Sequence, residues 1–380
     1  MGNCDSSLEN LRLKHNSKQN IKKDYGEFPS NLSSTTLPSV SASYFNGKDV
    51  PLPRQLKKNN STEKNNLLEN KQYLLSERIA KREDITKKYK LSKKPLGDGA
   101  TSLVYLGENS SNEKFAIKRI SKLKTTHKSN MLIKEAEICL KLNHKNIIKT
   151  YEIYEDINFI NIVMELGDTD LFELIVNSPL EVIPEALAIE FLIQIFEVID
   201  YLHNVENIVH CDIKPENFVV KFNKNNSKLT LKLIDFGNIR KKPINKERLF
   251  KFCGTKEYMA PEAFEKHGFN EKVDEWAAGI IMYNMLTGCE PFTSDNDSDY
   301  RDNIRFQEIN FNIIKNEKLR ELNKKLLNRY MAKRISAKEA LEEIKQIKNE
   351  INYNNDNIKS LKDNKNFCNV INNELSLMNI

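Results

Sequence analysis

Three polar side chains that could act together on a phosphate lie within six positions of one another in IVHCDIKPENF, at residues 208–218. Asp212 carries a carboxylate, Lys214 an ammonium and Asn217 an amide oxygen. A second carboxylate, Asp235, ends a strand-like run in LKLIDFG. These oxygens suit a hard cation that retains water, such as Mg²⁺, and the lysine could neutralise a phosphoryl group. Each residue alone could be an ordinary surface group, but the combination indicates metal-assisted phosphate chemistry.

Two further features precede this cluster. In LGDGATSLVY, Gly97 and Gly99 lie in a turn between strand-like runs, where missing side chains would let backbone N–H groups approach a phosphate. A glycine pair in a hairpin is also common as a plain turn. Lys118 ends the apolar run FAIK, and its ammonium would need an anionic partner if buried, which Glu135 could supply. The alternative is a strand-end lysine whose ammonium stays in water.

The elements that must position these residues change in character along the chain. From Tyr89 to Gly167, short alternating runs bounded by Gly, Asn and Ser predict strands and hairpins, with one helix over MLIKEAEICLKLNH. After Gly167 the pattern is mainly helical, with an apolar face repeating over residues 188–202. The sequence therefore predicts an α+β fold, with a small, mainly β lobe before a larger, mainly α lobe.

These motifs resemble those of the eukaryotic protein kinases over residues 89–345. GDGATSLV is similar to the glycine-rich loop, AIK to the ATP-anchoring lysine and HCDIKPEN to the catalytic loop. DFG is similar to the magnesium motif and GTKEYMAPE to the end of the activation segment. The resemblance implies a bilobal protein kinase fold, with an N-lobe at residues 89–166 and a C-lobe at residues 167–345. It also implies that Arg334 pairs with Glu262.

The resemblance implies a role for each matching residue. Lys118, paired with Glu135 or alternatively Glu137, would hold the α- and β-phosphates of ATP, while Asp235 and Asn217 would hold Mg²⁺. Asp212 would accept the proton of the substrate hydroxyl, with Lys214, Asn217 and Thr255 completing the catalytic group. The other residues expected around ATP are Gly97, Gly99, Ser102, Val104, Ala116, Met164, Glu165, Gly167 and Asp170.

The implied activity is transfer of the γ-phosphate of ATP to serine or threonine hydroxyls of proteins. Lys214 and Thr255 resemble the serine/threonine branch. The alternatives are a pseudokinase scaffold that binds nucleotide without efficient turnover, or a kinase of small molecules or lipids. Expected partners are ATP and protein substrates. The net charge of +6 is spread over many lysine-rich turns, so we expect no nucleic acid, and we expect a monomer.

Cys211 departs from the pattern of many kinases, which carry an arginine there to receive a phosphate on the activation segment. Between Gly237 and Thr255 the sequence contains no Ser, Thr or Tyr. Both absences together predict a kinase of the non-RD type that is not controlled by phosphorylation of this segment. A plain core role for Cys211 is compatible with that. The motifs are also similar to the monopolar-spindle checkpoint kinases and to the calcium/calmodulin-dependent-like kinases, and the subfamily stays open.

The ends of the chain are expected to lie outside the kinase domain. Residues 1–62 and 346–380 predict flexible tails, and residues 63–88 a possible helical extension. MGNCDS fits a myristoylation pattern at Gly2, and Cys4 could be palmitoylated. No secretory leader and no membrane-spanning run is expected. We therefore expect a cytoplasmic protein held peripherally on the inner membrane face by these acyl groups.

Overall fold

The computed structural model describes residues 79–99, 102–122, 129–178, 182–223, 228–245, 247–251, 254–294 and 296–355. The predictions for residues 1–78 and 356–380, including both acylation sites at Gly2 and Cys4, lie outside these ranges. None of the helices in the described ranges is long and apolar enough to cross a membrane.

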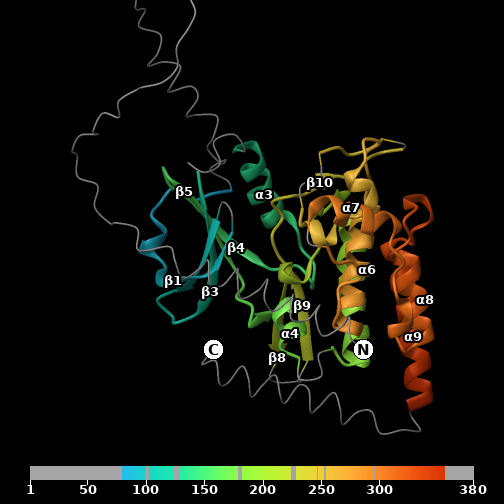
Figure 1. Cartoon of the computed structure of the whole chain (residues 1–380). Helices are drawn as coiled ribbons and strands as arrows, with labels where there is room; N and C mark the ends of the chain where they lie inside the picture. Colours follow the sequence, from blue (N-terminus) through green and yellow to red (C-terminus); the bar gives the residue numbers. More distant parts are fainter. Residues whose placement is uncertain are drawn as a thin grey trace, which may run out of the picture.

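The N-lobe is built on an antiparallel sheet of five strands: β1 (Lys90–Asp98), β2 (Ser102–Glu108), β3 (Lys114–Ser121), β4 (Thr150–Glu155) and β5 (Phe159–Met164). Their spatial order is β1-β2-β3-β5-β4, which leaves β1 and β4 outermost. Helix α3 (Ser129–Lys141) lies against this sheet, between the sheet and the C-lobe (Figure 1). The alternating runs of the sequence form these strands because side chains of each strand pack on one of two apolar clusters.

Residues 79–89, which we call the N-terminal strap, lie along β4. The backbone of Lys81 donates to the carbonyl of Ile153 at 2.9 Å and accepts from Glu155 at 3.0 Å, so the strap pairs with β4 in parallel. It then forms the 3₁₀ turn η1 (Ile85–Lys87). This differs from the helix expected at residues 63–88, of which residues 63–78 lie outside the described ranges.

Four donors converge on the Glu152 carboxylate of β4, and three of them come from the strap. They are the ammonium groups of Lys81 and Lys88, at 2.8 and 2.7 Å, and the hydroxyls of Tyr89 and Tyr154, at 3.0 and 2.8 Å. Burial alone would raise the pKa of Glu152, but these donors hold it at about 2. The strap is therefore anchored by a carboxylate that stays ionised in all but strongly acidic solution.

The C-lobe is mainly helical. Its helices are α4 (Leu171–Val176), α5 (Glu185–Asn204), α6 (Lys272–Thr287), α7 (Asp297–Phe306), α8 (Glu317–Leu326) and α9 (Ala337–Asn355). Strands β6 (Thr169–Asp170), β8 (Phe218–Asn223) and β9 (Lys228–Leu233) form one small sheet, and β7 (Ile208–Val209) pairs with β10 (Arg240–Lys241). The short 3₁₀ turns are η3 (Pro215–Asn217), η4 (Lys256–Tyr258), η5 (Pro261–Phe264), η6 (Phe311–Ile313) and η7 (Met331–Lys333).

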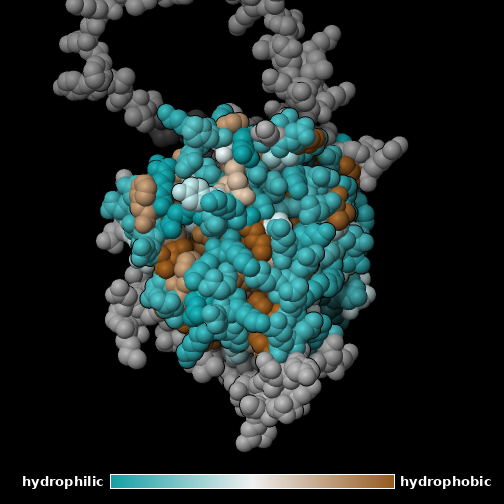
Figure 2. All heavy atoms as spheres, turned by 90° about the vertical axis from the view of Figure 1, so that its right-hand side faces the viewer, coloured by the Kyte–Doolittle hydropathy of each residue, from teal (hydrophilic) through white to brown (hydrophobic). Residues whose placement is uncertain are grey.

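The largest apolar cluster of the described residues lies in the C-lobe around α5. Phe191, Ile195 and Ile199 are fully buried there, as the apolar repeat predicted. Helix α9 extends to Asn355, beyond the tail boundary expected at residue 346, because Ile347 and Ile351 still pack on this cluster. On the outer face that carries α8 and α9, hydrophilic side chains predominate and apolar ones are scattered (Figure 2). The expected small β lobe followed by a larger helical lobe is confirmed.

Candidate active site

The Lys118 ammonium lies between two carboxylates that come from distant parts of the chain. It donates to Glu135 of α3 at 2.6 Å and to Asp235, just after β9, at 2.8 Å. The lysine side chain is 12% exposed and that of Glu135 7%. Burial would lower the pKa of Lys118, but the carboxylates of Glu135 and Asp235 raise it above its usual value. Glu135 is therefore the partner of this lysine, whereas Glu137 is exposed.

Asp235 is held in an unusual backbone conformation, with φ of 63°. A non-glycine residue in this left-handed region is strained, and such strain occurs where the surrounding structure fixes a functional side chain. Burial would raise the pKa of Asp235, but the Lys118 ammonium holds it at about 2. Gly237 leaves room for the pair, because a Cβ there would lie 3.3 Å from both Asp235 Oδ1 and Glu135 Oε2.

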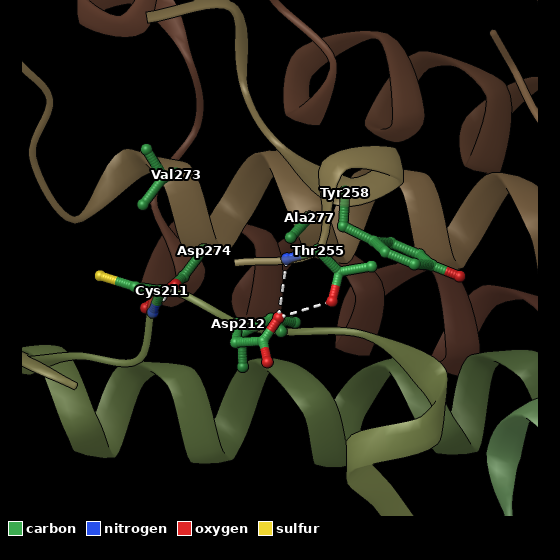
Figure 3. Close-up of a pocket in the computed structure, with 8 residues that line it drawn as sticks. Cys211, Asp212, Thr255, Tyr258, Val273, Asp274 and Ala277 are labelled. Carbon is green, nitrogen blue, oxygen red and sulfur yellow. Dashed lines mark hydrogen bonds between the residues drawn. The ribbon is translucent and has the colours of Figure 1, made fainter. Parts of the chain in front are cut away.

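Asp212 is bonded to Thr255 of the segment that follows residue 251. Its Oδ1 accepts from the Thr255 backbone at 3.0 Å and from the Thr255 hydroxyl at 2.9 Å (Figure 3). The Lys214 ammonium donates to the same hydroxyl at 2.8 Å and lies 3.6 Å from Asp212 Oδ2. The three residues thus form one hydrogen-bonded group, in which Oδ2 is the oxygen not used by Thr255. Asn238 also donates to Oδ2, at 3.4 Å.

The oxygens available to a metal ion come from Asn217 and Asp235. The Asn217 side-chain nitrogen donates to the Asp212 carbonyl at 2.8 Å, so its amide oxygen remains for a cation. The backbone carbonyl of Asn217 accepts from Ile234 at 2.8 Å, which keeps Asp235 next to the catalytic loop. Within the described ranges, no group of three or more His, Cys, Asp or Glu side chains could hold a metal. This two-oxygen set fits Mg²⁺, which keeps water and phosphate oxygens as its other ligands.

The catalytic loop rests on Asp274 of α6. The two carboxylate oxygens of Asp274 accept from the backbones of His210, at 2.7 Å, and Cys211, at 2.9 Å. His203 of α5 places Nε2 2.9 Å from Asp274 and Nδ1 3.3 Å from Glu275. An imidazole with a carboxylate at each nitrogen is favoured in its charged form. Burial lowers the pKa of His203, but Glu275 and Asp274 raise it overall from 6.5 to about 10.

The Cys211 side chain is 3% exposed and packs in an apolar cluster with Val209, Phe269 and Trp276. Its sulfur points away from the Asp212 carboxylate (Figure 3). Its φ of 64° lies in the left-handed region, which is uncommon for a residue other than glycine. The thiol therefore fills a core position, and this burial removes the exposure that a redox role would need.

The predicted adenine-side residues share one apolar cluster that spans both lobes. Val104 of β2, Ala116 of β3 and Met164 of β5 belong to it, with Leu166 and Val219. Ala116 lies opposite Met164 in the β3–β5 ladder. The segment linking the lobes, which we call the hinge (residues 165–168), follows directly. The structure therefore brings these sequence-predicted residues together beside the hinge.

The hinge is fixed to the C-lobe by several contacts. The Glu165 carboxylate lies 3.3 Å from the Lys232 ammonium, and Lys221 donates to the Leu166 carbonyl at 2.7 Å. Gly167 packs so closely on β8 that an added Cβ would lie 2.7 Å from Val219 Cβ. A side chain at position 167 would therefore displace the hinge.

Two other predicted regions lie at the edges of this cluster. Gly97 and Gly99 lie at the end of β1, where the Gly99 backbone donates to the Ser102 carbonyl at 2.9 Å. Residues 100–101, at the tip of this loop, are outside the described ranges. Asp170 caps α4 by accepting from the Glu173 backbone at 2.9 Å. Burial raises the pKa of Asp170 from 3.8 to about 7.

Comparison with known proteins agrees with this geometry. The family model for the protein kinase domain matches residues 90–344. The chain belongs to the protein kinase family. Calcium-dependent protein kinase 4 of Plasmodium berghei is 34% identical over 258 residues, which are 66% of this chain and 48% of that protein. Myosin light chain kinase A of Dictyostelium discoideum is 38% identical over 208 residues, 53% of this chain and 68% of that protein.

A third relative, serine/threonine-protein kinase DCLK3 of Mus musculus, is 36% identical over 223 residues, 58% of this chain and 26% of that protein. The chain thus spans about half the length of the calcium-dependent protein kinase that it matches, and less of DCLK3. The family and the bilobal fold expected from the sequence are confirmed.

A buried ion pair holds the end of the kinase's activation segment. Arg334 donates to Glu262 of η5 at 2.5 and 3.0 Å, and it also donates to the carbonyls of Lys272 and Asn328. Its guanidinium lies 5.0 Å from the centroid of the Trp276 ring. The structure therefore places Arg334 beside Glu262, where the family resemblance put it.

Sequence reasoning missed several residues that support the kinase site. The residues predicted from the sequence do not include Asp274, His203 or Lys221. Asp274 and His203 could have been suspected, because ionisable residues within otherwise apolar helical runs usually have buried partners. For Lys221 the sequence holds no comparable signal, because its partner is a backbone carbonyl 55 residues away.

Proposed function

We propose that this protein is an ATP- and magnesium-dependent serine/threonine kinase that phosphorylates protein substrates. The observation that carries the proposal is the Lys118–Glu135–Asp235 ion cluster, formed next to a catalytic loop in which Asp212 is bonded to Thr255. A pseudokinase commonly loses one of these groups, and here all are present. The relatives that bear kinase names support the same assignment.

Each residue of the site would have its own role in phosphoryl transfer. Asp212 Oδ2 is not bonded to Thr255 and accepts only two long hydrogen bonds of 3.4 Å, from Asn217 and Asn238. It would orient the substrate hydroxyl and take its proton. Lys214, already beside Asp212, would neutralise charge on the transferred group, and Lys118 would hold the phosphates. Mg²⁺, held by Asn217 and Asp235, would supply shielding of the phosphate charge. Because the transition state is loose, this positioning accounts for most of the catalysis.

The proposal can be tested with purified protein, Mg²⁺ and labelled ATP on generic protein substrates. We expect phosphorylation on serine and threonine, a loss of at least about a hundredfold in Asp212→Asn, and a similar loss in Lys118→Met. Nucleotide-induced thermal stabilisation without turnover would instead support the pseudokinase alternative. Equal signals from wild-type protein and Asp212→Asn would overturn the assignment.

We also propose that activity does not depend on a phosphate in the activation segment. The Lys214–Thr255–Asp212 hydrogen bonds are formed with Cys211 buried and with no Ser, Thr or Tyr between Gly237 and Thr255. Phosphatase-treated protein, verified by intact-mass measurement, should therefore keep its full rate. A large loss of rate on dephosphorylation would contradict this.

The N-terminal residues motivate a separate proposal about location. Gly2 and Cys4 in MGNCDS would carry a myristoyl and a palmitoyl group and would hold the kinase on the cytoplasmic face of a membrane. Gly2→Ala should move the protein to the soluble fraction on cell fractionation, and Cys4→Ser should weaken membrane retention. An unchanged distribution of Gly2→Ala would exclude this mode of anchoring.

A further inference from the structure

The peptide unit between Leu166 and Gly167 carries an unusual contact. The Lys221 ammonium, on β8, donates to the Leu166 carbonyl at 2.7 Å, and the contact is partly buried. Val219, two residues earlier on the same face of β8, packs against Gly167. This face of β8 therefore contacts the hinge twice. The Val219 side chain packs against Gly167, and the Lys221 ammonium binds the Leu166 carbonyl.

The geometry fixes where the other end of that peptide unit points. The described residues contain no cis peptide bond, so the Leu166 carbonyl and the Gly167 N–H point in opposite directions. Lys221 holds the carbonyl, and the N–H is directed away from it. Within the described ranges no hydrogen-bond acceptor is found for this N–H. It is therefore available to a ligand that enters beside the apolar cluster of Met164 and Ala116.

A hydrogen bond from an ammonium to a backbone carbonyl changes the donor strength of the N–H in the same peptide unit. A charge-assisted hydrogen bond to the oxygen draws electrons from the amide nitrogen, which makes the N–H a stronger donor. Adjacent backbone contacts keep the unit in place: Asp168 donates from its backbone to Val220 at 2.9 Å, and its side chain accepts from Phe222 at 2.7 Å. The N–H thus has both enhanced donor strength and a fixed direction.

We propose that Lys221 is a positioning residue for nucleotide binding, which strengthens the hydrogen bond that Gly167 donates to the adenine ring. This inference rests on the proposed kinase function, because it takes the bound base to be adenine. Lys221 acts through the peptide unit and does not touch the nucleotide. The ring atom that accepts would be N1, a nitrogen on the Watson–Crick edge. Removing the Lys221 ammonium should therefore weaken nucleotide binding only when the adenine carries N1.

The chain offers a matched control. Lys232, on the neighbouring strand β9, also places an ammonium at the hinge, 3.3 Å from Glu165, but its partner is a side-chain carboxylate. Lys232→Met removes the same charge from the same side of the hinge and leaves the Leu166 carbonyl untouched. A general electrostatic effect on nucleotide phosphates would weaken binding in both variants.

The test measures dissociation constants for ATP and for 1-deaza-ATP, in which N1 is replaced by a C–H group, by calorimetry on the full chain. Lys221→Met should bind ATP roughly 3- to 10-fold more weakly and 1-deaza-ATP almost as well as the wild-type protein does. Lys221→Arg should restore most of the affinity, and Lys221→Gln, a neutral donor, should lie between. Lys232→Met should change the affinity for both nucleotides by the same factor, so the ratio of its two dissociation constants should stay within about twofold of the wild-type ratio.

The possible outcomes separate this inference from the proposed function. Failure of the wild-type protein to bind ATP would overturn the function itself. Wild-type binding with equal losses in Lys221→Met for both nucleotides, or an equal change in the ratio of the two dissociation constants in Lys221→Met and Lys232→Met, would overturn only the role of Lys221. If Lys221→Met does not fold, the comparison of Lys221→Gln with Lys221→Arg decides the question in the same way.

Discussion

Replacing Arg334 by methionine should strongly destabilise the kinase, because it leaves a buried carboxylate without a counter-ion. The Arg334 side chain is 0% exposed and that of Glu262 7%. Arg334 donates to both oxygens of Glu262 and to two backbone carbonyls, so four hydrogen bonds are lost at once. Removal of one partner of a buried ion pair costs about 3–5 kcal/mol.

That free energy translates into a measurable shift. For a domain of this size, 1 kcal/mol corresponds to roughly 2–4 °C in Tm, so Arg334→Met should lower Tm by at least about 6 °C. Urea unfolding followed by circular dichroism gives the free energy directly. Because Glu262 follows the segment that contains Thr255, the phosphorylation rate should fall as well.

The double variant Arg334→Met with Glu262→Gln tests the reasoning. Since the lone charge is then absent, it should be more stable than Arg334→Met alone by about 1 kcal/mol or more. If the two single losses simply add in the double variant, the cost does not come from the uncompensated carboxylate, and the attribution to a buried lone charge is wrong.

Three other groups lead to further predictions. The pKa of His203 is raised from 6.5 to about 10, so its contribution to stability is complete below pH 6.5 and is lost as the pH rises through 10; urea midpoints should fall over this range, and less so in His203→Gln. Burial raises the pKa of Asp170 to about 7, so its ionisation opposes folding at higher pH; Asp170→Asn, which keeps a helix cap, should raise Tm at pH 8 and change it little at pH 4, and an equal gain at both would contradict this. Cys211→Arg would bring a guanidinium into an apolar cluster beside β10, which begins at Arg240; it should cost about 3 kcal/mol or more in urea unfolding without increasing the phosphorylation rate, whereas Cys211→Ala should cost about 1 kcal/mol.

The residues of the site were predictable where their chemistry is encoded over a short distance in the sequence. Asp212, Lys214 and Asn217 fall within one loop, and the structure brings them together through contacts among themselves and with Thr255. For Lys118 the sequence left two glutamates, Glu135 and Glu137, as alternative partners, and in the structure the ammonium bonds to Glu135. The sheet lobe followed by a helical lobe was predictable from the change in apolar period.

The features that could not be predicted from the sequence depend on contacts between residues far apart in the chain. The leucines of residues 63–88 suggested a helix, but in the described part of that range the chain pairs with the edge of β4, a partner 72 residues away for Lys81. The polar composition after residue 346 suggested a tail, yet two isoleucines spaced four apart keep α9 on the core through Ile351. The Lys221 ammonium reaches the Leu166 carbonyl because of the way β8 packs against the hinge, and no local sequence pattern predicts that packing.

The N-terminal strap also changes where the folded unit begins. The family match starts at residue 90, but β4 is the outermost strand of its sheet, and Lys81 of the strap makes two backbone hydrogen bonds to its free side. A protein cut at Lys90 would leave that strand open, and open strands recruit strands from other molecules. Such a truncated kinase should self-associate and precipitate on storage, whereas one that begins at Ile79 should stay dispersed.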